Sequence, residues 1–296
     1  MEKGILNLLF FLIILINPEI KNHTPSNKGN KMTANEIVNL IKNNVTCKWQ
    51  SKTVDTFKGG NPDDEVKGIA TTFMATSDVL KKAKSKGLNF IITHEPTYYN
   101  HFDETAEFEN DKVVAEKMRF IKENHLIIFR FHDHWHMTNP DGIITGMITK
   151  LGWGKHLKDK NDLIFVLPEM TIKELASSLQ KKFNATAVRV VGNPYMKVTN
   201  AALVVGAPGS IPQIKSLERE DVEVLIAGET HEWETVEYVR DAVSMGKKKA
   251  LILIGHLNSE EAGMDYCAGW LKGFIKNIPI EFIPSGDPLW NPSLKD

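Results

Sequence analysis

Residues 250–260 read ALILIGHLNSE, and this stretch decides the fold class. A short apolar run ends at a glycine, after which His256 and Glu260 follow four residues apart. An apolar pattern typical of a helix then covers residues 259–275. A buried strand that passes directly into a helix is the repeating unit of α/β proteins, so this stretch predicts that fold class.

The same alternation of strands and helices extends along the chain on both sides of this stretch. Further strands are expected at residues 66–75, 88–93, 126–131, 188–191, 201–205 and 222–227. Further helices are expected at residues 34–44, 79–86, 112–123, 143–151, 171–183 and 233–244. Helices between successive strands favour mostly parallel pairing. The segment 192–200, rich in Gly, Pro and Asn, is the place where two lobes could separate.

The composition excludes several classes of protein. The chain has 296 residues, with 36 Lys and Arg against 37 Asp and Glu, so its net charge is -1. That balance gives no overall attraction to nucleic acid, and we expect a small-molecule substrate instead. The 2 cysteines are too few for a disulfide scaffold or a cysteine-rich zinc module.

The N-terminus carries a separate signal. Residues 5–16 read ILNLLFFLIILI after Lys3, and a polar spacer continues to residue 31. This run is shorter than the roughly 20 residues of a membrane span and is typical of a signal peptide. No small-x-small cleavage site stands out, so an uncleaved membrane anchor or a buried helix remains an alternative. We expect an exported protein, periplasmic or secreted, or one anchored by this segment, with its single domain at residues 32–296.

Histidines and carboxylates follow the predicted buried strands. Six of the ten histidines lie at four such strand ends, in the segments His94-Glu95, His132 to His136, Glu229 to His231, and His256 to Glu260. Because the carboxyl ends of parallel strands share one edge of a sheet, these residues are expected to meet in a cleft there. Imidazole and carboxylate groups are ligands for Zn, Mn, Fe or Co. Each motif taken singly is also compatible with a hydrogen-bonded packing histidine.

Spacing adds detail to this predicted site. His132, His134 and His136 alternate, so they would face one side if their segment is extended. His256 and Glu260 would share one face of a helix.

Two weaker signals leave alternatives open. The loop at residues 206–210 could cradle a phosphate, but it lacks the spacing of a P-loop and is interpreted as a tight turn. Trp135, Tyr98 and Tyr99 could stack on a planar substrate or belong to the core.

Four motifs together resemble the dinuclear-metal family known as GTP cyclohydrolase type 2-like, or NGG-interacting-factor-three-like. They are IITHEP at 91–96, the segment 132–136, GET-H at 228–231 and GHLNSE at 255–260. The last fits the family form Gly-His-x-x-[Thr/Ser]-Glu. The resemblance spans about residues 33–290, and the large middle insertion of some members is absent.

Two departures from the family pattern fall on ligand positions. The family usually has a His-His pair where this chain has His94-Glu95, and a bridging Asp where this chain has His136. The resemblance therefore implies a set of three histidines and two carboxylates: His94, Glu95, His136, His256 and Glu260. An imidazole nitrogen cannot bridge two ions, so if two ions bind, Glu260, alone or with Glu95, would be the bridging group. The alternative is a site that holds a single ion. His132, His134 and Asp133 are additional candidate ligands.

The resemblance also implies what the protein is and does. It implies two similar α/β lobes, at about residues 32–160 and 161–296, a homo-hexamer, and two divalent metal ions per chain. It further implies hydrolysis of a nucleotide-like or phosphorylated substrate. In such chemistry Glu95 or Glu229 would take a proton from water, and His231 would protonate the leaving group.

Two other functions are alternatives to the hydrolysis that the resemblance implies. The first is metal binding or delivery without turnover. The second is a metallo-β-lactamase type of enzyme, which His132-x-His134 suggests. That motif needs Asp-His where this chain has His136-Met137, so the match fails.

Overall fold

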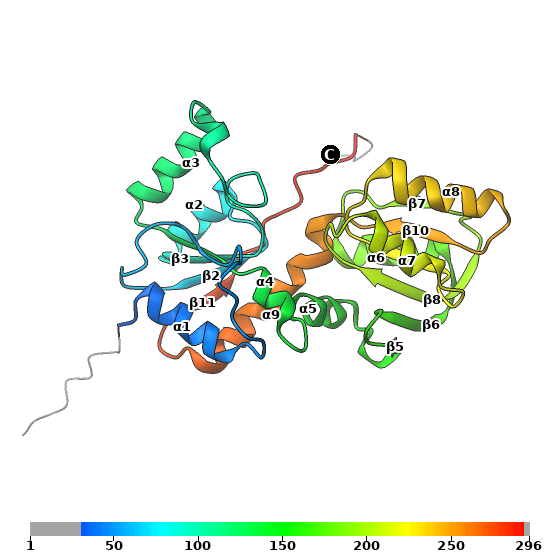
Figure 1. Cartoon of the computed structure of the whole chain (residues 1–296), viewed down its shortest axis with the longest axis horizontal. Helices are drawn as coiled ribbons and strands as arrows, with labels where there is room; N and C mark the ends of the chain where they lie inside the picture. Colours follow the sequence, from blue (N-terminus) through cyan, green and yellow to red (C-terminus); the bar gives the residue numbers. More distant parts are fainter. Residues whose placement is uncertain (1–30, 293–296) are drawn as a thin grey trace, which may run out of the picture. The chain divides into compact units, whose positions relative to one another are not determined.

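The computed structural model describes residues 31–292, which form two β-sheets with helices on both faces of each (Figure 1). The predicted leader at residues 1–31 lies outside the described residues except for Lys31. Within the described range, no helix combines the length and apolar character that crossing a membrane requires. The two sheets covered by helices confirm the α/β fold class.

The first sheet has the strand order β1-β4-β3-β2-β11. Strands β4, β3, β2 and β11 are parallel, and only β1 pairs in the antiparallel direction. Every residue of β2, β3 and β4 is buried, as expected for parallel strands covered on both faces. The strands are β1 (Phe57–Gly59), β2 (Ile69–Thr72), β3 (Phe90–Thr93), β4 (Ile127–Arg130) and β11 (Ile280–Phe282).

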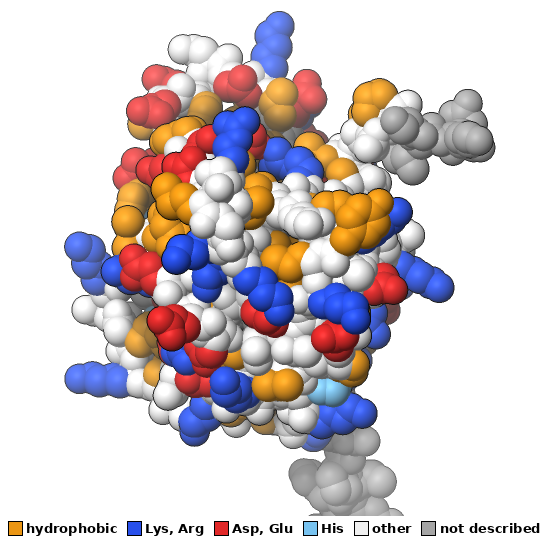
Figure 2. Space-filling view, turned by 90° about the vertical axis from the view of Figure 1, so that its right-hand side faces the viewer, with side chains coloured by type: hydrophobic (Ala, Val, Ile, Leu, Met, Phe, Trp, Pro, Cys, Tyr) orange, Lys and Arg blue, Asp and Glu red, His pale blue; other side chains and the backbone are white. Residues whose placement is uncertain are grey.

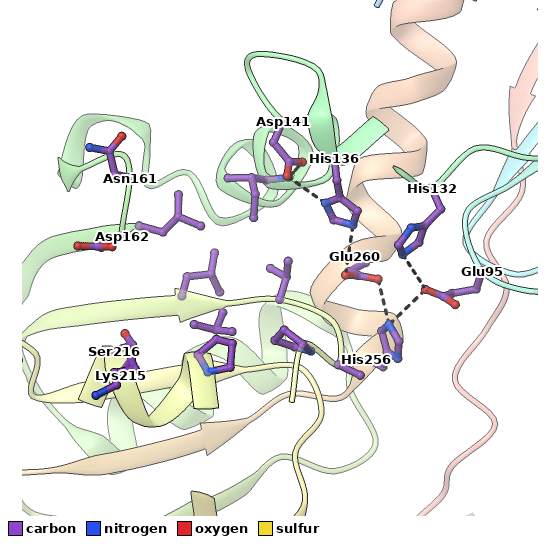
Figure 3. Close-up of a pocket in the computed structure, with 18 of the residues that line it drawn as sticks. Glu95, His132, His136, Asp141, Asn161, Asp162, Lys215, Ser216, His256 and Glu260 are labelled. Atoms are coloured by element: carbon purple, nitrogen blue, oxygen red, sulfur yellow. Dashed lines mark hydrogen bonds and ion pairs between the residues drawn. The ribbon is translucent and has the colours of Figure 1, made fainter. Parts of the chain in front are cut away.

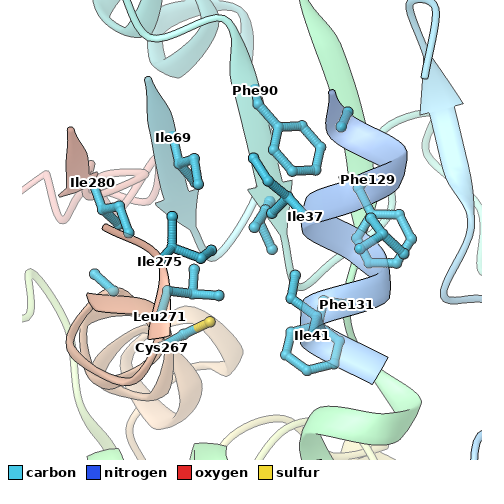
Figure 4. Packing of buried hydrophobic residues seen from close by; sticks show 14 of the residues in the cluster. Ile37, Ile41, Ile69, Phe90, Phe129, Phe131, Cys267, Leu271, Ile275 and Ile280 are labelled. Carbon is cyan, nitrogen blue, oxygen red and sulfur yellow. The ribbon is translucent and has the colours of Figure 1, made fainter. Parts of the chain in front are cut away.

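Helices cover both faces of the first sheet. They are α1 (Ala34–Asn44) and α9 (His256–Phe274) on one face, and α2 (Ser77–Ser85) and α3 (Lys112–Glu123) on the other. Figure 4 shows Ile37 of α1 beside Phe90 of the sheet, and Leu271 of α9 beside Ile275, nearer to Ile69, in the same cluster. Helix α1 starts where predicted because Thr33 and Glu36 form a reciprocal capping box.

The second sheet has the strand order β5-β6-β8-β9-β10-β7 and mixed pairing. Strands β8, β9 and β10 are parallel, whereas β5, β6 and β7 pair in the antiparallel direction. The prediction of mostly parallel pairing thus describes the first sheet but not the second. Its strands are β5 (Leu157–Asp159), β6 (Ile164–Thr171), β7 (Arg189–Val191), β8 (Lys197–Val204), β9 (Val224–Ala227) and β10 (Ala250–Leu253).

The second sheet is also covered on both faces. Its helices are α5 (Gly142–Leu151) and α6 (Ile172–Phe183) on one side, and α7 (Ser210–Glu218) and α8 (Glu237–Ser244) on the other. The remaining short elements are α4 (Asp133–Met137), η1 (Ala106–Phe108), η2 (Gly154–His156) and the π-helical turn η3 (Glu232–Val236). Figure 2 shows cationic and anionic side chains interspersed on one face, in keeping with the near-zero net charge.

Helix α9 connects the two sheets. It begins directly after β10 of the second sheet and ends just before β11 of the first. The chain therefore returns to the first sheet, and a division at about residue 160 does not separate the two sheets along the whole chain. Helix α9 crosses α5 so closely that a Cβ atom added at Gly146 would lie 2.5 Å from the Cα of Gly263. This crossing fixes the N-terminus of α9, which carries His256 and Glu260.

Candidate metal centre

Side chains from three parts of the chain meet where β3, β4 and β10 end. His94 and Glu95 follow β3, the segment 132–136 follows β4, and His256 opens α9 after β10. Figure 3 shows His132, His136 and His256 directed toward Glu95 and Glu260. His94 is fully buried, and Glu260 is 3% exposed. The strand ends thus bring together most of the predicted ligands.

Residues Asp133–Met137 form helix α4, so the condition under which His132, His134 and His136 would all face one side, an extended segment, is not met. The physical reason is Asp55, a buried residue far away in the sequence. Its carboxylate accepts the backbone N–H groups of His132, Asp133 and His134, at 2.7, 2.9 and 2.8 Å. These bonds satisfy the free donors of a helix N-terminus. On the resulting turn, residues four apart share a face and the residue between them points elsewhere.

His134 consequently has a structural role in place of the predicted ligand role. Its Nδ1 lies 2.7 Å from the Asp55 carboxylate, and its Nε2 accepts the N–H of Gln50 at 2.8 Å. Its ring stacks on Trp49 with the ring centres 3.7 Å apart. Both ring nitrogens are engaged, so none is free to bind a metal ion.

This difference gives a paired prediction for His134 and His132. His134→Ala should destabilise the metal-free fold by about 2–4 kcal/mol, because it removes two buried hydrogen bonds and leaves a cavity. His132→Ala should leave that stability almost unchanged but weaken metal binding roughly tenfold or more. Thermal melts of the metal-free proteins and elemental analysis separate the two effects. Metal loss without destabilisation in His134→Ala would contradict the assignment.

Four histidines share one arrangement around the cluster. Each holds its Nδ1 next to an oxygen that accepts hydrogen bonds: His94 next to Phe131 O at 3.3 Å, His132 next to Asp133 Oδ1 at 3.0 Å, His136 next to Asp141 Oδ2 at 3.0 Å, and His256 next to Glu229 Oε2 at 3.2 Å. A carbonyl or carboxylate only accepts, so each Nδ1 carries the hydrogen. The four Nε2 atoms are left to face the cluster, as in metal-binding histidines oriented by an outer partner.

The Nε2 atoms surround the carboxylates of Glu260 and Glu95. Glu260 Oε2 lies 3.0 Å from His256 Nε2 and 3.4 Å from His94 Nε2, and Oε1 lies 3.9 Å from His136 Nε2. Glu95 Oε1 lies 3.4 Å from His256 Nε2 and 3.9 Å from His132 Nε2. The buried His94 Nε2 has no hydrogen-bond partner among the described residues.

Two groups of donors in this cluster are compact enough to hold an ion. They are His94, His132 and His136, and His94, Glu95 and Glu260, with the donor atoms of each group within 4.8 Å of one another. The chemistry of the donors and the unpaired buried nitrogen therefore fit a divalent metal ion.

The two carboxylates of the cluster are ionised and favour a cation between them. Burial opposes ionisation of Glu95, but its hydrogen bond with His256 and the nearby histidines prevail and lower its pKa to about 2. The pKa of Glu260 is lowered in the same way, against burial, by His256 and His94. Burial and the repulsion of neighbouring histidines lower the pKa of His132 to about 4, so its ring is neutral, as a metal ligand must be.

His256 is the exception, since its bonds to Glu260 and Glu95 outweigh burial and raise its pKa to about 10. Without a metal ion, a proton on His256 thus supplies positive charge between the two carboxylates.

A buried arginine fixes the strand end that carries His94 and Glu95. Arg130 is fully buried; its Nε donates to His94 O at 3.1 Å and its Nη1 donates to His101 O. Its Nη2 lies 3.6 Å from Glu95 Oε2, and its Nη1 lies 3.6 Å from Asp103 Oδ2. Arg130 therefore holds the strand end and the following loop together beneath the cluster.

The structure places the remaining predicted residues around the cluster rather than within it. Glu229 orients His256, and Asp133 orients His132 while it accepts hydrogen bonds from Thr53 and Val54. His231 bonds Glu234 at 2.9 Å and stacks on the exposed Trp233. His231 does not line the pocket beside the cluster.

That pocket has a volume of about 950 Å³ and contains residues that the sequence reasoning missed. His101 lines it near His132, but it lies in a loop away from any strand end and so gave no signal. Asp141 orients His136 and also caps α5, which is a recognisable signal at the sequence level. Trp135 and Tyr98 are buried in the core, and neither they nor Tyr99 line the pocket.

Comparison with known proteins gives the family. A family profile described as Duf34/NIF3 (NGG1p interacting factor 3) matches residues 32–288. The chain belongs to this family. Two curated relatives, each called GTP cyclohydrolase 1 type 2 homolog, are 24% identical to it. The one from Clostridium acetobutylicum aligns over 75% of this chain and 82% of its own length, and the one from Clostridium perfringens over 77% and 87%.

Solved structures show the same NIF3 fold. A Bacillus cereus protein described as related to NIF3 superposes with a TM-score of 0.69 at 14% identity, covering 88% of this chain and 99% of that one. A hypothetical protein from Staphylococcus aureus superposes with a TM-score of 0.68 at 17% identity, covering 86% and 97%. At such identities the likeness concerns the fold alone.

Proposed function

We propose that this NIF3-family protein is a metal-dependent hydrolase with a dinuclear histidine and carboxylate centre, acting on a small molecule in the adjacent pocket. One observation carries the proposal. Four histidines hold Nδ1 against a fixed acceptor and direct Nε2 at Glu95 and Glu260. A packing histidine needs no such common orientation, whereas a metal site does.

The ligand assignment follows from the donor atoms. Glu260 directs one oxygen at His136 and the other at His94 and His256, so it is the carboxylate that would hold both ions. Glu95 faces His132 and His256 and completes the set. Each imidazole Nε2 binds a single ion, so the two compact donor groups that share His94 cannot both be complete. Glu260 would then be the residue that the two ions share.

The chemistry of the site divides between the ions and the chain. When bound, divalent ions there would polarise a substrate carbonyl or phosphoryl oxygen and make water more acidic. Asp141 and Glu229 hold the rings of His136 and His256 in place. Glu95 lines the pocket in its ionised form: its Oε1 faces the histidines, and its Oε2, which faces Arg130, would accept a proton from water.

Metal content of the full chain tests this proposal. Elemental analysis should give about two divalent ions per chain, the stoichiometry of a two-metal hydrolytic site. His94→Ala should lose most of this metal because it removes a ligand nitrogen at the centre of the cluster. His231→Ala is the matched control, since its exposed ring bonds Glu234 outside the pocket, and it should retain the metal. An unchanged metal content in His94→Ala would refute the ligand assignment.

Turnover separates hydrolysis from metal handling. The metal-loaded protein should hydrolyse at least one member of a panel of amides, phosphoesters and nucleotides, and metal removal should abolish that activity. Six donor side chains converge on the cluster, which is enough to saturate the coordination of a single ion. Full metal occupancy without turnover across the panel would therefore favour a metal-binding or delivery function.

A further inference from the structure

The pocket beside the cluster continues well beyond it. Figure 3 shows Glu95, His132, His136, His256 and Glu260 at one end, with Asn161, Asp162, Lys215 and Ser216 at the other. The walls that line the pocket between these ends are aliphatic: Ile144, Leu163, Leu203, Val204, Val205, Ala207, Pro208 and Pro212. Among the described residues, no aromatic ring other than histidine lines the pocket. A substrate body in this corridor would meet alkyl groups rather than a stacking surface.

The far end of this corridor offers no free positive charge. Arg219 donates to both oxygens of Asp221, at 3.0 and 3.2 Å, and to Asp162. Lys215 donates to Glu218 at 2.8 Å. Both cations that line the pocket thus already have carboxylate partners, so a phosphate there would compete with these carboxylates and meet their negative charge.

The nearby glycine-containing loop cannot serve as a phosphate cradle either. The N–H of Gly206 donates to Ser259 Oγ at 2.9 Å. Ser210, the first residue of α7, donates its hydroxyl to the Glu234 carboxylate. A negative charge therefore already occupies the helix end where an anion would bind.

One polar group at the far end lacks a partner. The Oγ of Ser216 is buried and has no hydrogen-bond partner among the described residues. Ser216 lines the corridor, and its buried hydroxyl would have to turn toward the corridor to bond an uncharged amide or hydroxyl group of a ligand.

We propose that the substrate has an aliphatic body in this corridor, an uncharged hydrogen-bonding end at Ser216, and a carbonyl-type head group at the cluster. This inference rests on the proposed function for the head group and goes beyond it for the rest. The proposed substrate class is therefore small aliphatic amides or related acyl compounds. A nucleoside triphosphate with its base at the cluster would place its phosphates against alkyl groups and neutralised cations, so that class is disfavoured.

Alkyl hydroxamates test the corridor directly, because the head group chelates divalent metals while the chain length varies. Isothermal titration of the metal-loaded full chain should show affinity rising about three- to fourfold per methylene from acetohydroxamate to octanohydroxamate. A second pair keeps length fixed and changes charge: the monohydroxamate of octanedioic acid carries a terminal carboxylate, and its amide does not. The amide should bind at least several-fold more tightly.

Two variants locate the effect. Leu163 has a φ of +48°, a conformation that Asn tolerates, so Leu163→Asn preserves the backbone while removing an alkyl wall. The affinity ratio of octano- to acetohydroxamate should fall roughly tenfold in this variant. Val166→Asn is the matched control on the exposed side of β6 and should keep the wild-type ratio. Ser216→Ala should remove the preference for the amide end.

The outcomes distinguish the corridor from the metal centre. Equal affinity for all chain lengths, or tighter binding of the carboxylate than of the amide, would overturn the proposal while the metal centre stood. If the protein took up no metal, the proposed function would fail, and the corridor would be tested with octanamide against acetamide. Octanamide should then still bind more tightly, and equal binding of the two amides would overturn the corridor as well.

Discussion

Glu260→Gln should remove most of the bound metal and reduce any hydrolytic activity by more than 100-fold. Losing an outer partner of a ligand typically costs about 10–100-fold in affinity, and losing a ligand that we propose to be shared by two ions should cost more. Glu260 is 3% exposed and lies within 3.4 Å of two Nε2 atoms, so the glutamine side chain would fill the same space and leave no position for a compensating anion. Glutamine has the same shape but neither the charge nor a second oxygen.

The adjacent glutamate provides the control. Glu261 accepts the N–H of Ser285 at 2.7 Å and does not line the pocket. Glu261→Gln keeps an acceptor oxygen for that bond, so metal content and activity should remain at the wild-type level. Elemental analysis and turnover should be measured on both variants, with thermal melts to verify folding. Equal metal loss in the two variants would mean that general acidity, rather than the bridging position of Glu260, attracts the ions.

The sequence predicted the location of the cluster because it depends on strand ends. His94, Glu95 and His256 follow apolar strands directly, and parallel pairing brings such ends together whatever the details of packing. The fold class followed from the same pattern. Mixed pairing in the second sheet was not predictable in this way, because β6 pairs with β8 and β7 with β10, both antiparallel and both set by long-range contacts.

The assignment of individual histidines in the segment 132–136 failed for a different reason. Alternate residues share a face in an extended segment but not in a helix. Here the Asp55 carboxylate, some 80 residues earlier in the sequence, favours the helix by accepting the N–H of His134 at 2.8 Å. No pattern in the sequence near His134 predicts this contact. The aliphatic corridor could not be predicted from the sequence either. Its walls come from α5, β8 and the loop before α7, and their apolar residues have the same pattern as residues of the hydrophobic core.

Gly146→Ala should destabilise the fold by about 2–4 kcal/mol, although alanine is the better helix former. An added Cβ would lie 2.4 Å from Ala262 O and 2.5 Å from Gly263 Cα, both backbone atoms that cannot rotate away. Helices α5 and α9 would have to move apart. Because α9 carries Glu260 and Asp141 caps α5 beside His136, the same shift should loosen the cluster and weaken metal binding.

The same substitution on the exposed side of α9 should have the opposite sign. A Cβ added at Gly269 meets nothing within 4 Å, so Gly269→Ala should stabilise the protein by about 0.5–1 kcal/mol through helix propensity alone. Thermal and chemical unfolding of the two variants, with and without metal, measures both effects. If the unfolding free energy falls in Gly146→Ala and rises in Gly269→Ala, the close backbone contact at the helix crossing, rather than glycine flexibility, determines the effect. The contact between α5 and α9 would then be what positions the ligands on the two helices. A stable Gly146→Ala variant with full metal content would refute that account.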